Sequence, residues 1–281
     1  MKKRLVISDD LTLAYLDYGA GKPVIFIPGW TYTAKVFARN LPAFAGRYRV
    51  LAYDQRSHGD SGVTAAGNDF RQHGADLYEF INRLELDDCL IAGWSFGVCT
   101  AYSYFEQFGS AGVRGFISID EPPKIRKENG MDWGEGEEDE LRAGLEMLTK
   151  LGHLKFFENY LYHCYVQKPD PDFVRDMLSE AARTPEAVAC ELIRTSFDLD
   201  YREVARRIDK EIPVMQVVRE DWRKAAGQWI SENQPNARIY YMPAHLSFHE
   251  FAEDFNAHML EFVDGSYSCP RSSLIASFPG C

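Results

Sequence analysis

The chain has 281 residues, of which 46% are hydrophobic and 14% aromatic, a composition that excludes disordered and fibrous proteins and allows a sizeable core. Its formal net charge of -11 disfavours nucleic acid and anionic membrane surfaces as partners, because both are negatively charged and bind proteins through a positively charged surface. We therefore expect a globular protein whose partner is a small molecule.

The cysteines and the N-terminal residues indicate in which cellular compartment the protein is expected. The six cysteines have neither a CxxC pair nor the spacing of a zinc site: Cys89, Cys99, Cys164, Cys190, Cys269 and Cys281. After the basic start Met1-Lys2-Lys3-Arg4, only the three apolar residues Leu5-Val6-Ile7 precede further polar residues, which is too short for a secretory signal. No run approaches the roughly 18 apolar residues of a membrane span. We expect a reduced, cytoplasmic protein that uses no metal and no cofactor.

Short apolar runs bounded by turn residues predict strands along both ends of the chain. An imperfect alternation over residues 11–16 suits an early antiparallel strand. A continuous apolar run follows at residues 24–27, and further strand-like segments lie at residues 48–53, 89–92, 115–119, 212–218 and 237–241. Helical spacing separates several of them, with helices expected near residues 77–84, 224–230 and 251–263. This alternation predicts an α/β protein with a doubly wound, mostly parallel sheet whose site lies at the carboxyl ends of the strands.

The middle of the chain has a different pattern. From residue 124 to about 210 strand-like runs are scarce and apolar residues recur at helical spacing, which predicts a helical cap. Residues 1–123 and 211–264 then form the two parts of the core. The acidic run Glu135–Glu140 is expected to start a solvated helix, and residues 265–281 to form a loosely ordered tail.

The stretch Gly93-Trp94-Ser95-Phe96-Gly97 lies between an apolar run and a segment of mostly small residues, as expected for strand, sharp turn and helix. Glycines two positions either side of the serine allow strand and helix to approach closely, so that the Ser95 hydroxyl is exposed. A serine needs an adjacent base to become a nucleophile, and the base needs an orienting group.

Three histidines lie late enough in the chain to serve that serine. His245 follows a predicted strand end and is the preferred base, ahead of His249 one turn later and His258 inside the last helix. The loop of His245 can reach back to Ser95, whereas the other two suit capping, surface or core positions.

The acid has three candidates. The commoner position, a few residues beyond the strand ending at Val218, holds Trp222, and Asp221 comes slightly early. Asp120 ends the strand after the serine helix and is preferred over Asp221, with Glu121 third. An aspartate there would hold the imidazole in one tautomer, although it could also simply cap the turn before Pro122.

Negative charge that develops on a reacting oxygen atom is stabilised by hydrogen-bond donors placed beside it. We expect them to be the backbone amides of Phe96, just after the serine, and of Trp30, in the loop Pro28-Gly29-Trp30 that follows an early strand. The alternative for Gly29 is an ordinary turn glycine.

Together these residues resemble the α/β-hydrolase superfamily over nearly all of residues 5–264. Pro28-Gly29-Trp30 looks like the oxyanion loop, residues 54–61 like the turn that usually follows it, and residues 93–97 like the nucleophile elbow.

Within that superfamily the acid at Asp120, the Trp30 loop and the spacing from Ser95 to His245 are similar to the cofactor-free 3-hydroxy-4-oxoquinoline 2,4-dioxygenases. The resemblance implies that His245, supported by Asp120, removes the 3-hydroxyl proton, and that the anion reacts with molecular oxygen and releases carbon monoxide. Ser95 would then position the substrate. Trp94 and Phe96 stand where that family has histidines.

Two other functions stay open. In a serine hydrolase of small esters or lactones, Ser95 attacks and His245 transfers the proton. A noncatalytic ligand-binding protein requires Ser95 and His245 to lie beyond hydrogen-bond reach of roughly 3 Å. In any of these, aromatic residues of the cap suit a flat ring, if they are not simply core: Trp133, Phe156, Phe157, Tyr160 and Tyr162.

Overall fold

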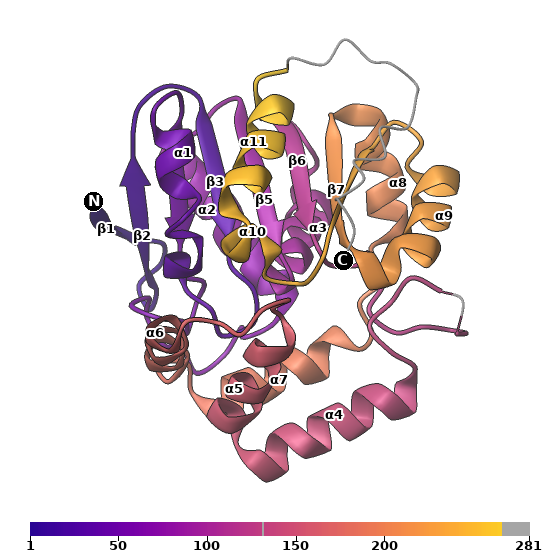
Figure 1. Ribbon diagram of the computed structural model, residues 1–281. Helices are drawn as coiled ribbons and strands as arrows, with labels where there is room; N and C mark the ends of the chain where they lie inside the picture. The colour runs from indigo at the N-terminus through magenta and orange to yellow at the C-terminus, as the bar shows by residue number, and fades with distance from the viewer. Residues whose placement is uncertain (131, 266–281) are drawn as a thin grey trace.

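The computed structural model describes residues 1–130 and 132–265 (Figure 1). The tail expected over residues 265–281 therefore lies outside the described residues from 266 onward. Within the described part, eight strands form one sheet in the order β1-β2-β4-β3-β5-β6-β7-β8. Their bounds are β1 (Lys2–Val6), β2 (Thr12–Tyr18), β3 (Pro23–Ile27), β4 (Arg49–Tyr53), β5 (Cys89–Trp94), β6 (Val113–Ile119), β7 (Val214–Arg219) and β8 (Arg238–Met242).

The sheet is parallel from β4 to β8, whereas β1 pairs antiparallel with β2 and β2 antiparallel with β4. This confirms the doubly wound, mostly parallel sheet expected from the sequence. Strands β3 and β5 are buried at every residue, because helices cover both faces of the sheet. The strand β1 is mostly exposed and lies at one edge, where its apolar content is too low to be recognised from sequence.

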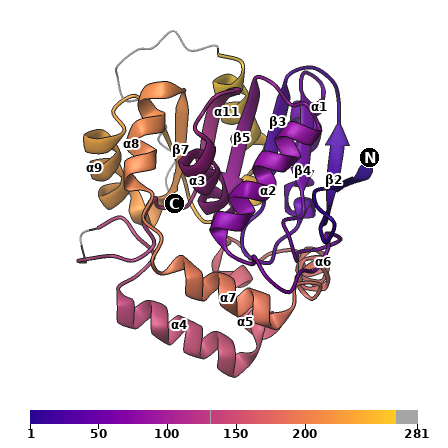
Figure 2. The ribbon, with the colours of Figure 1, turned by 180° about the vertical axis from the view of Figure 1, so that it is seen from behind.

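Helices form a layer on each face of the sheet. The pair α2 (Phe70–Arg83) and α3 (Phe96–Phe108) covers one face (Figure 2), with α8 (Arg202–Glu211) against α3. On the other face lie α1 (Leu41–Ala45), α10 (Ser247–Glu250) and α11 (Ala252–Val263) (Figure 1). The remaining core elements are α9 (Arg223–Asn233) and the short turns η1 (Ala34–Phe37) and η2 (Glu220–Trp222).

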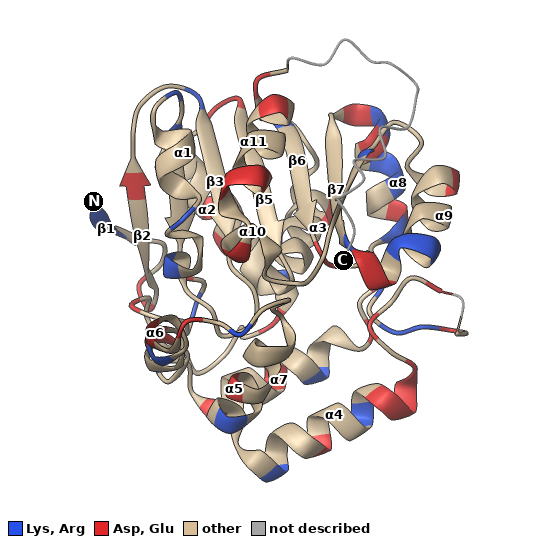
Figure 3. Cartoon of the chain, viewed as in Figure 1, with Lys and Arg blue, Asp and Glu red and all other residues tan. Residues whose placement is uncertain are grey.

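Four helices gather beyond one end of the sheet (Figures 1 and 2): α4 (Glu138–Leu151), α5 (His153–His163), α6 (Pro171–Ala181) and α7 (Glu186–Ser196). They lie within the range expected for the cap, and they pack with the core in one hydrophobic cluster. Acidic residues colour the first turn of α4 red in Figure 3, and Glu137 and Glu140 form its capping box. Glu135, from the same acidic run, instead forms an ion pair with Arg219 of β7.

Candidate functional site

Ser95 occupies a sharp turn between β5 and α3. Its φ of 52° and ψ of -132° lie in a region that side chains rarely adopt, so the surrounding packing must stabilise the turn. The Ser95 amide donates to Ile119 O at 2.9 Å, which ties the turn to β6. A Cβ at Gly97 would lie 2.2 Å from Ile27 O, and one at Gly93 would lie 2.5 Å from Gly97 O. Only glycine fits these two positions, as the sequence motif implies.

His245 and Asp120 form a buried pair beside that turn. Nδ1 of His245 lies 2.6 Å from Oδ2 of Asp120, and the two residues are 4% and 0% exposed. The other carboxylate oxygen of Asp120 accepts the Arg219 amide at 2.8 Å. The Trp94 indole donates to the carbonyl of His245 at 3.1 Å, which fixes the histidine's backbone beneath the cap. Since a carboxylate at Nδ1 places the ring proton there, Nε2 is left as a base.

The remaining nitrogen of His245 is unengaged. Nε2 is buried and has no hydrogen-bond partner among residues 1–130 and 132–265, so it is not hydrogen-bonded to Ser95 in this conformation. Ser95 itself is 8% exposed, and the ring of the preceding Trp94 lies 5.0 Å from the His245 ring, centroid to centroid. Hydrogen bonds between catalytic groups are often long until a substrate is bound.

Arg219 occupies the strand end of β7, next to the usual position of the acid. One guanidinium nitrogen, Nη1, lies 3.5 Å from both Asp120 Oδ2 and His245 Nδ1, and Nη2 lies 3.3 Å from Glu135 Oε2. Burial opposes the charge of Arg219, but the carboxylates of Glu135 and Asp120 raise its pKa overall. The guanidinium also stacks 3.3 Å from the ring centroid of Trp222. This cation was not among the residues expected at the site, and its only signal in the sequence is its place at a strand end.

Glu121 is a second carboxyl group near Ser95. It is 1% exposed, and burial together with Glu135 raises its pKa well above the usual range. Interactions with Arg219 and the Ser95 hydroxyl act in the opposite direction. Glu121 was the third candidate for the acid. In the structure His245 contacts Asp120, and Glu121 interacts with the serine instead. Asp221 is exposed in η2.

The loop after β3 lies directly against Ser95. A Cβ at Gly29 would lie 2.8 Å from the Ser95 Cβ, so Gly29 is more than a turn glycine. Trp30 follows Gly29 in this loop, and Phe96 begins α3 directly after the serine, in the first turn of the helix, where amides lack intrahelical partners. The Trp30 indole points to the cap and donates to Ala189 O of α7 at 2.9 Å.

The aromatic residues of the cap divide into two groups. Phe156 and Phe157 of α5 pack on Trp30 with ring centroids 5.7 and 6.3 Å away, and Tyr160 lies 5.9 Å from His245. Trp133 instead packs on Trp222 and Trp229, and Tyr162 is 41% exposed. Of the five aromatic residues, Phe156, Phe157 and Tyr160 of α5 therefore lie near Trp30 or His245, and Phe157 is fully buried in the core.

The other late histidines lie elsewhere. His249 accepts or donates a hydrogen bond at 2.7 Å with the Tyr165 hydroxyl, and its ring packs on Phe173. His258 contacts the Asp254 carbonyl within α11 and packs on Tyr240. Neither of these contacts involves Asp120, whereas His245 pairs with it.

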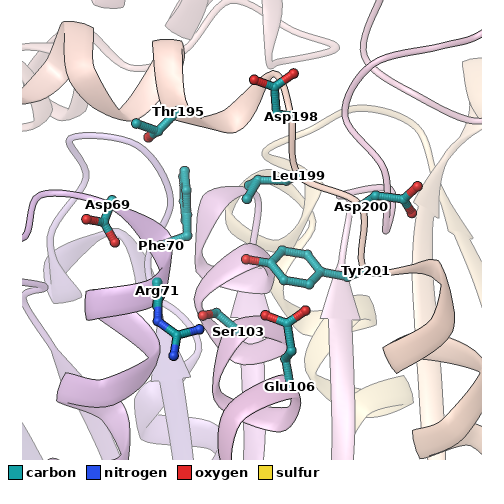
Figure 4. Close-up of a pocket in the computed structure, with 10 residues that line it drawn as sticks. All are labelled: Asp69, Phe70, Arg71, Ser103, Glu106, Thr195, Asp198, Leu199, Asp200 and Tyr201. Carbon is teal, nitrogen blue, oxygen red and sulfur yellow. The ribbon is translucent and has the colours of Figure 1, made fainter.

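A separate hollow lies on the surface between α2, α3 and the segment after α7 (Figure 4). Its volume is about 350 Å³, and its lining includes Asp69, Glu106 and Tyr201. Asp69 caps α2 by accepting the Gln72 amide at 2.9 Å. Ser95 and His245 do not line this hollow, so it is distinct from the cluster at the strand ends.

No helix within residues 1–130 and 132–265 has the length and apolar character needed to cross a membrane. In that part of the chain, no group of three or more His, Cys, Asp or Glu side chains is placed to hold a metal ion. Cys89, Cys99 and Cys164 are buried free thiols there, and Cys190 is partly buried.

Known proteins share parts of this sequence. A putative non-heme chloroperoxidase of Synechocystis sp. is 29% identical over 124 residues, which cover 43% of this chain and 45% of that protein. A non-heme haloperoxidase of Rhodococcus erythropolis is 30% identical over 119 residues, or 42% of this chain and 43% of that protein. The chain thus spans less than half the length of these curated relatives.

Solved structures share the whole architecture. A bromoperoxidase from Bacillus anthracis superposes with a TM-score of 0.85 at 20% identity, covering 94% of this chain and 100% of that one. An esterase from Exiguobacterium antarcticum gives a TM-score of 0.84 at 20% identity, with the same coverage. At this identity the likeness concerns the fold alone. None of these four proteins is a dioxygenase, so the narrower resemblance to the quinoline dioxygenases gains no support from them.

A family model described as alpha/beta hydrolase fold matches residues 22–166, just over half of the 281 residues. The matched range includes the loop of Trp30, the turn at Ser95 and the strand that ends before Asp120. Together with the sheet order and the strained serine turn, this match shows that the chain belongs to the alpha/beta hydrolase fold family.

Proposed function

We propose that the protein is a serine hydrolase of small, uncharged esters or lactones. The observation that carries the proposal is that Ser95, in its strained turn after β5, and the buried Asp120 and His245, after β6 and β8, all follow the carboxyl ends of parallel strands of one sheet. The esterase among the structural neighbours and the haloperoxidases among the relatives are compatible with this class but do not define the substrate.

The residues suggest a two-step reaction. Ser95 Oγ attacks the carbonyl carbon while Nε2 of His245 takes the hydroxyl proton, which requires the serine side chain to turn toward the histidine. Asp120 stabilises the imidazolium through Nδ1, and the amides of Trp30 and Phe96 donate to the oxyanion. His245 then protonates the leaving alcohol, and in the second step it activates the water that releases the acid from Ser95.

Ester hydrolysis with matched variants tests this proposal. The wild type should hydrolyse 4-nitrophenyl acetate or a small lactone, and Ser95→Ala should lose at least about 10³-fold in kcat because no nucleophile remains. The control is Ser110→Ala, in the loop after α3, where the hydroxyl contacts Glu211 far from His245. Equal turnover by Ser95→Ala and the wild type would refute the proposal.

A second candidate is the cofactor-free dioxygenase. One observation favours it: His245 pairs with Asp120 while its Nε2 makes no hydrogen bond to Ser95, an arrangement suited to deprotonating a substrate hydroxyl directly. Oxygen uptake with a 3-hydroxy-4-quinolone in the presence of a chelator, abolished in His245→Ala and retained in Ser95→Ala, would establish this reaction. No uptake would exclude it for that substrate class.

A further inference from the structure

Glu121 lies beside the candidate nucleophile without belonging to the His245–Asp120 pair. It follows Asp120, whose φ of 55° turns the chain at the end of β6. The two adjacent carboxyl groups therefore contact different residues. Asp120 contacts His245, whereas Glu121 interacts with the Arg219 guanidinium and the Ser95 hydroxyl, both of which favour its ionised form. Since Glu121 interacts with the Ser95 hydroxyl, we expect an acyl group attached to Ser95 to lie close to the Glu121 side chain.

One oxygen of Glu121 has no protein partner. Oε1 is buried and makes no hydrogen bond within residues 1–130 and 132–265, although the residue is only 1% exposed. Buried polar groups in folded proteins almost always have a partner, and an exception is commonly associated with function. A polar atom of a bound substrate would supply the missing hydrogen bond.

The charges around Glu121 favour its protonated form. Arg219 is the cation facing it, and this guanidinium already contacts Asp120 and Glu135. Burial, and then the negative charge of Glu135, hold the pKa of Glu121 well above its usual range. Two further groups on neighbouring helices interact with it, Tyr160 of α5 and Cys99 of α3, and neither is a cation. A protonated carboxyl group can donate a hydrogen bond, which a carboxylate cannot.

We infer that Glu121 determines substrate specificity by donating a hydrogen bond to a second oxygen atom in the acyl group of the substrate. The preferred substrates are then uncharged esters or lactones whose acyl chain carries an ether, keto or hydroxyl oxygen near the carbonyl carbon. This inference rests on the proposed hydrolase function. Substrates with a carboxylate are disfavoured, because Asp120 and Glu135 share one arginine and leave the site with excess negative charge.

Two 4-nitrophenyl esters of equal size test the inference. Methoxyacetate differs from butyrate by one ether oxygen in place of a methylene, and the ratio of their kcat/KM values reports the contribution of that oxygen. Comparing this ratio between variants cancels both the intrinsic reactivity of the esters and any general loss of activity. We expect the ratio to be about tenfold higher in wild type than in Glu121→Met, and Glu121→Gln to keep it through its amide N–H.

The pH dependence separates a donor from a merely structural residue. In wild type the preference for methoxyacetate should fall as the pH rises and Glu121 loses its proton, whereas in Glu121→Gln it should not change with pH. If Glu121→Met does not fold, the wild-type profile and the glutamine variant still decide the question. An unchanged ratio in Glu121→Met, or a pH-independent wild-type ratio, would overturn the inference.

A third ester and a chemical probe complete the design. The 3-aminopropanoate ester has the same size and a terminal ammonium group; its preference over methoxyacetate would show an ionised Glu121 and overturn the inference. Labelling by a fluorophosphonate reports the nucleophile separately. A wild type without labelling and without ester turnover refutes the hydrolase proposal itself, whereas a labelled wild type with a constant ester ratio refutes only the role of Glu121.

Discussion

Nδ1 of His245 lies 2.6 Å from Oδ2 of Asp120, although 125 residues separate the two in the sequence. The acid of this pair follows β6, while the exposed Asp221 lies beyond β7. The contact therefore selects Asp120 among the three candidates as the residue that orients His245.

Substitution of Asp120 by asparagine should reduce kcat for ester hydrolysis about 10³-fold or more. Asparagine keeps the shape but removes the negative charge that stabilises the imidazolium and fixes its tautomer. The matched variant Asp221→Asn should stay within about twofold of wild type, since Asp221 is exposed. Steady-state kinetics of both variants check this, and a larger effect from Asp221→Asn would reassign the acid.

Substitution of Arg219 by methionine should destabilise the protein by about 2–3 kcal/mol. The change leaves Asp120, which is fully buried, and the partly buried Glu135 without their shared cation. Urea unfolding measures the difference in free energy. The control Arg175→Met breaks an ion pair whose side chains are 69% and 77% exposed, and it should change stability by at most about 0.5 kcal/mol. Equal effects of the two substitutions would contradict a structural role for the Arg219 contacts.

Substitution of Gly29 by alanine should reduce kcat/KM at least about tenfold. The added methyl group would lie 2.8 Å from the Ser95 Cβ and 3.2 Å from its Oγ, so the serine or the oxyanion loop must move. Gly46→Ala is the control, because a Cβ there meets nothing within 4 Å and its φ of -70° suits any residue. Full activity of Gly29→Ala would show that the loop does not position the serine.

Stability should fall as the pH drops from about 6.5 to 4, in part because of His58. Burial lowers the pKa of this fully buried histidine to about 4. The unfolded chain therefore binds a proton in this window that the folded chain excludes, at a cost of about 3 kcal/mol by pH 4.

The substitution His58→Asn isolates this effect. Asparagine retains a donor for the Arg56 carbonyl, which His58 contacts at 2.8 Å, but has no proton to gain. The slope of the free energy of unfolding between pH 6.5 and 4 should become smaller than in wild type. The exposed His163→Asn should keep the wild-type slope. An unchanged slope in His58→Asn would show that His58 does not contribute.

The sequence predicts the sheet well because its signals are local. Apolar runs bounded by glycine, proline or aspartate correspond to β3 through β8, and the glycines around Ser95 mark the turn by their steric requirement. Strand order also explains why Asp120 and His245 could be proposed as partners, since parallel strands end at one edge of the sheet. The exposed β1 gave no such pattern.

Contacts between the cap and the core join residues far apart in the sequence, so local sequence patterns do not predict them. Glu135 resembles the solvated acids that follow it, yet its carboxylate contacts Arg219. Trp133 and Tyr160 are both aromatic residues of the middle segment, but only Tyr160 lies against His245. Helical spacing shows that these residues can be buried, but not against which element.

Labelling of Ser95 tests the central claim most directly. Wild type is incubated with a fluorophosphonate, and intact mass spectrometry follows the covalent adduct, with peptide mapping to locate it. We predict one adduct per chain on Ser95, none in Ser95→Ala, and slow labelling in His245→Ala, since the histidine supplies the base. An unlabelled wild type that consumes oxygen with a 3-hydroxy-4-quinolone would contradict the hydrolase and support the His245–Asp120 pair as a base acting on the substrate itself.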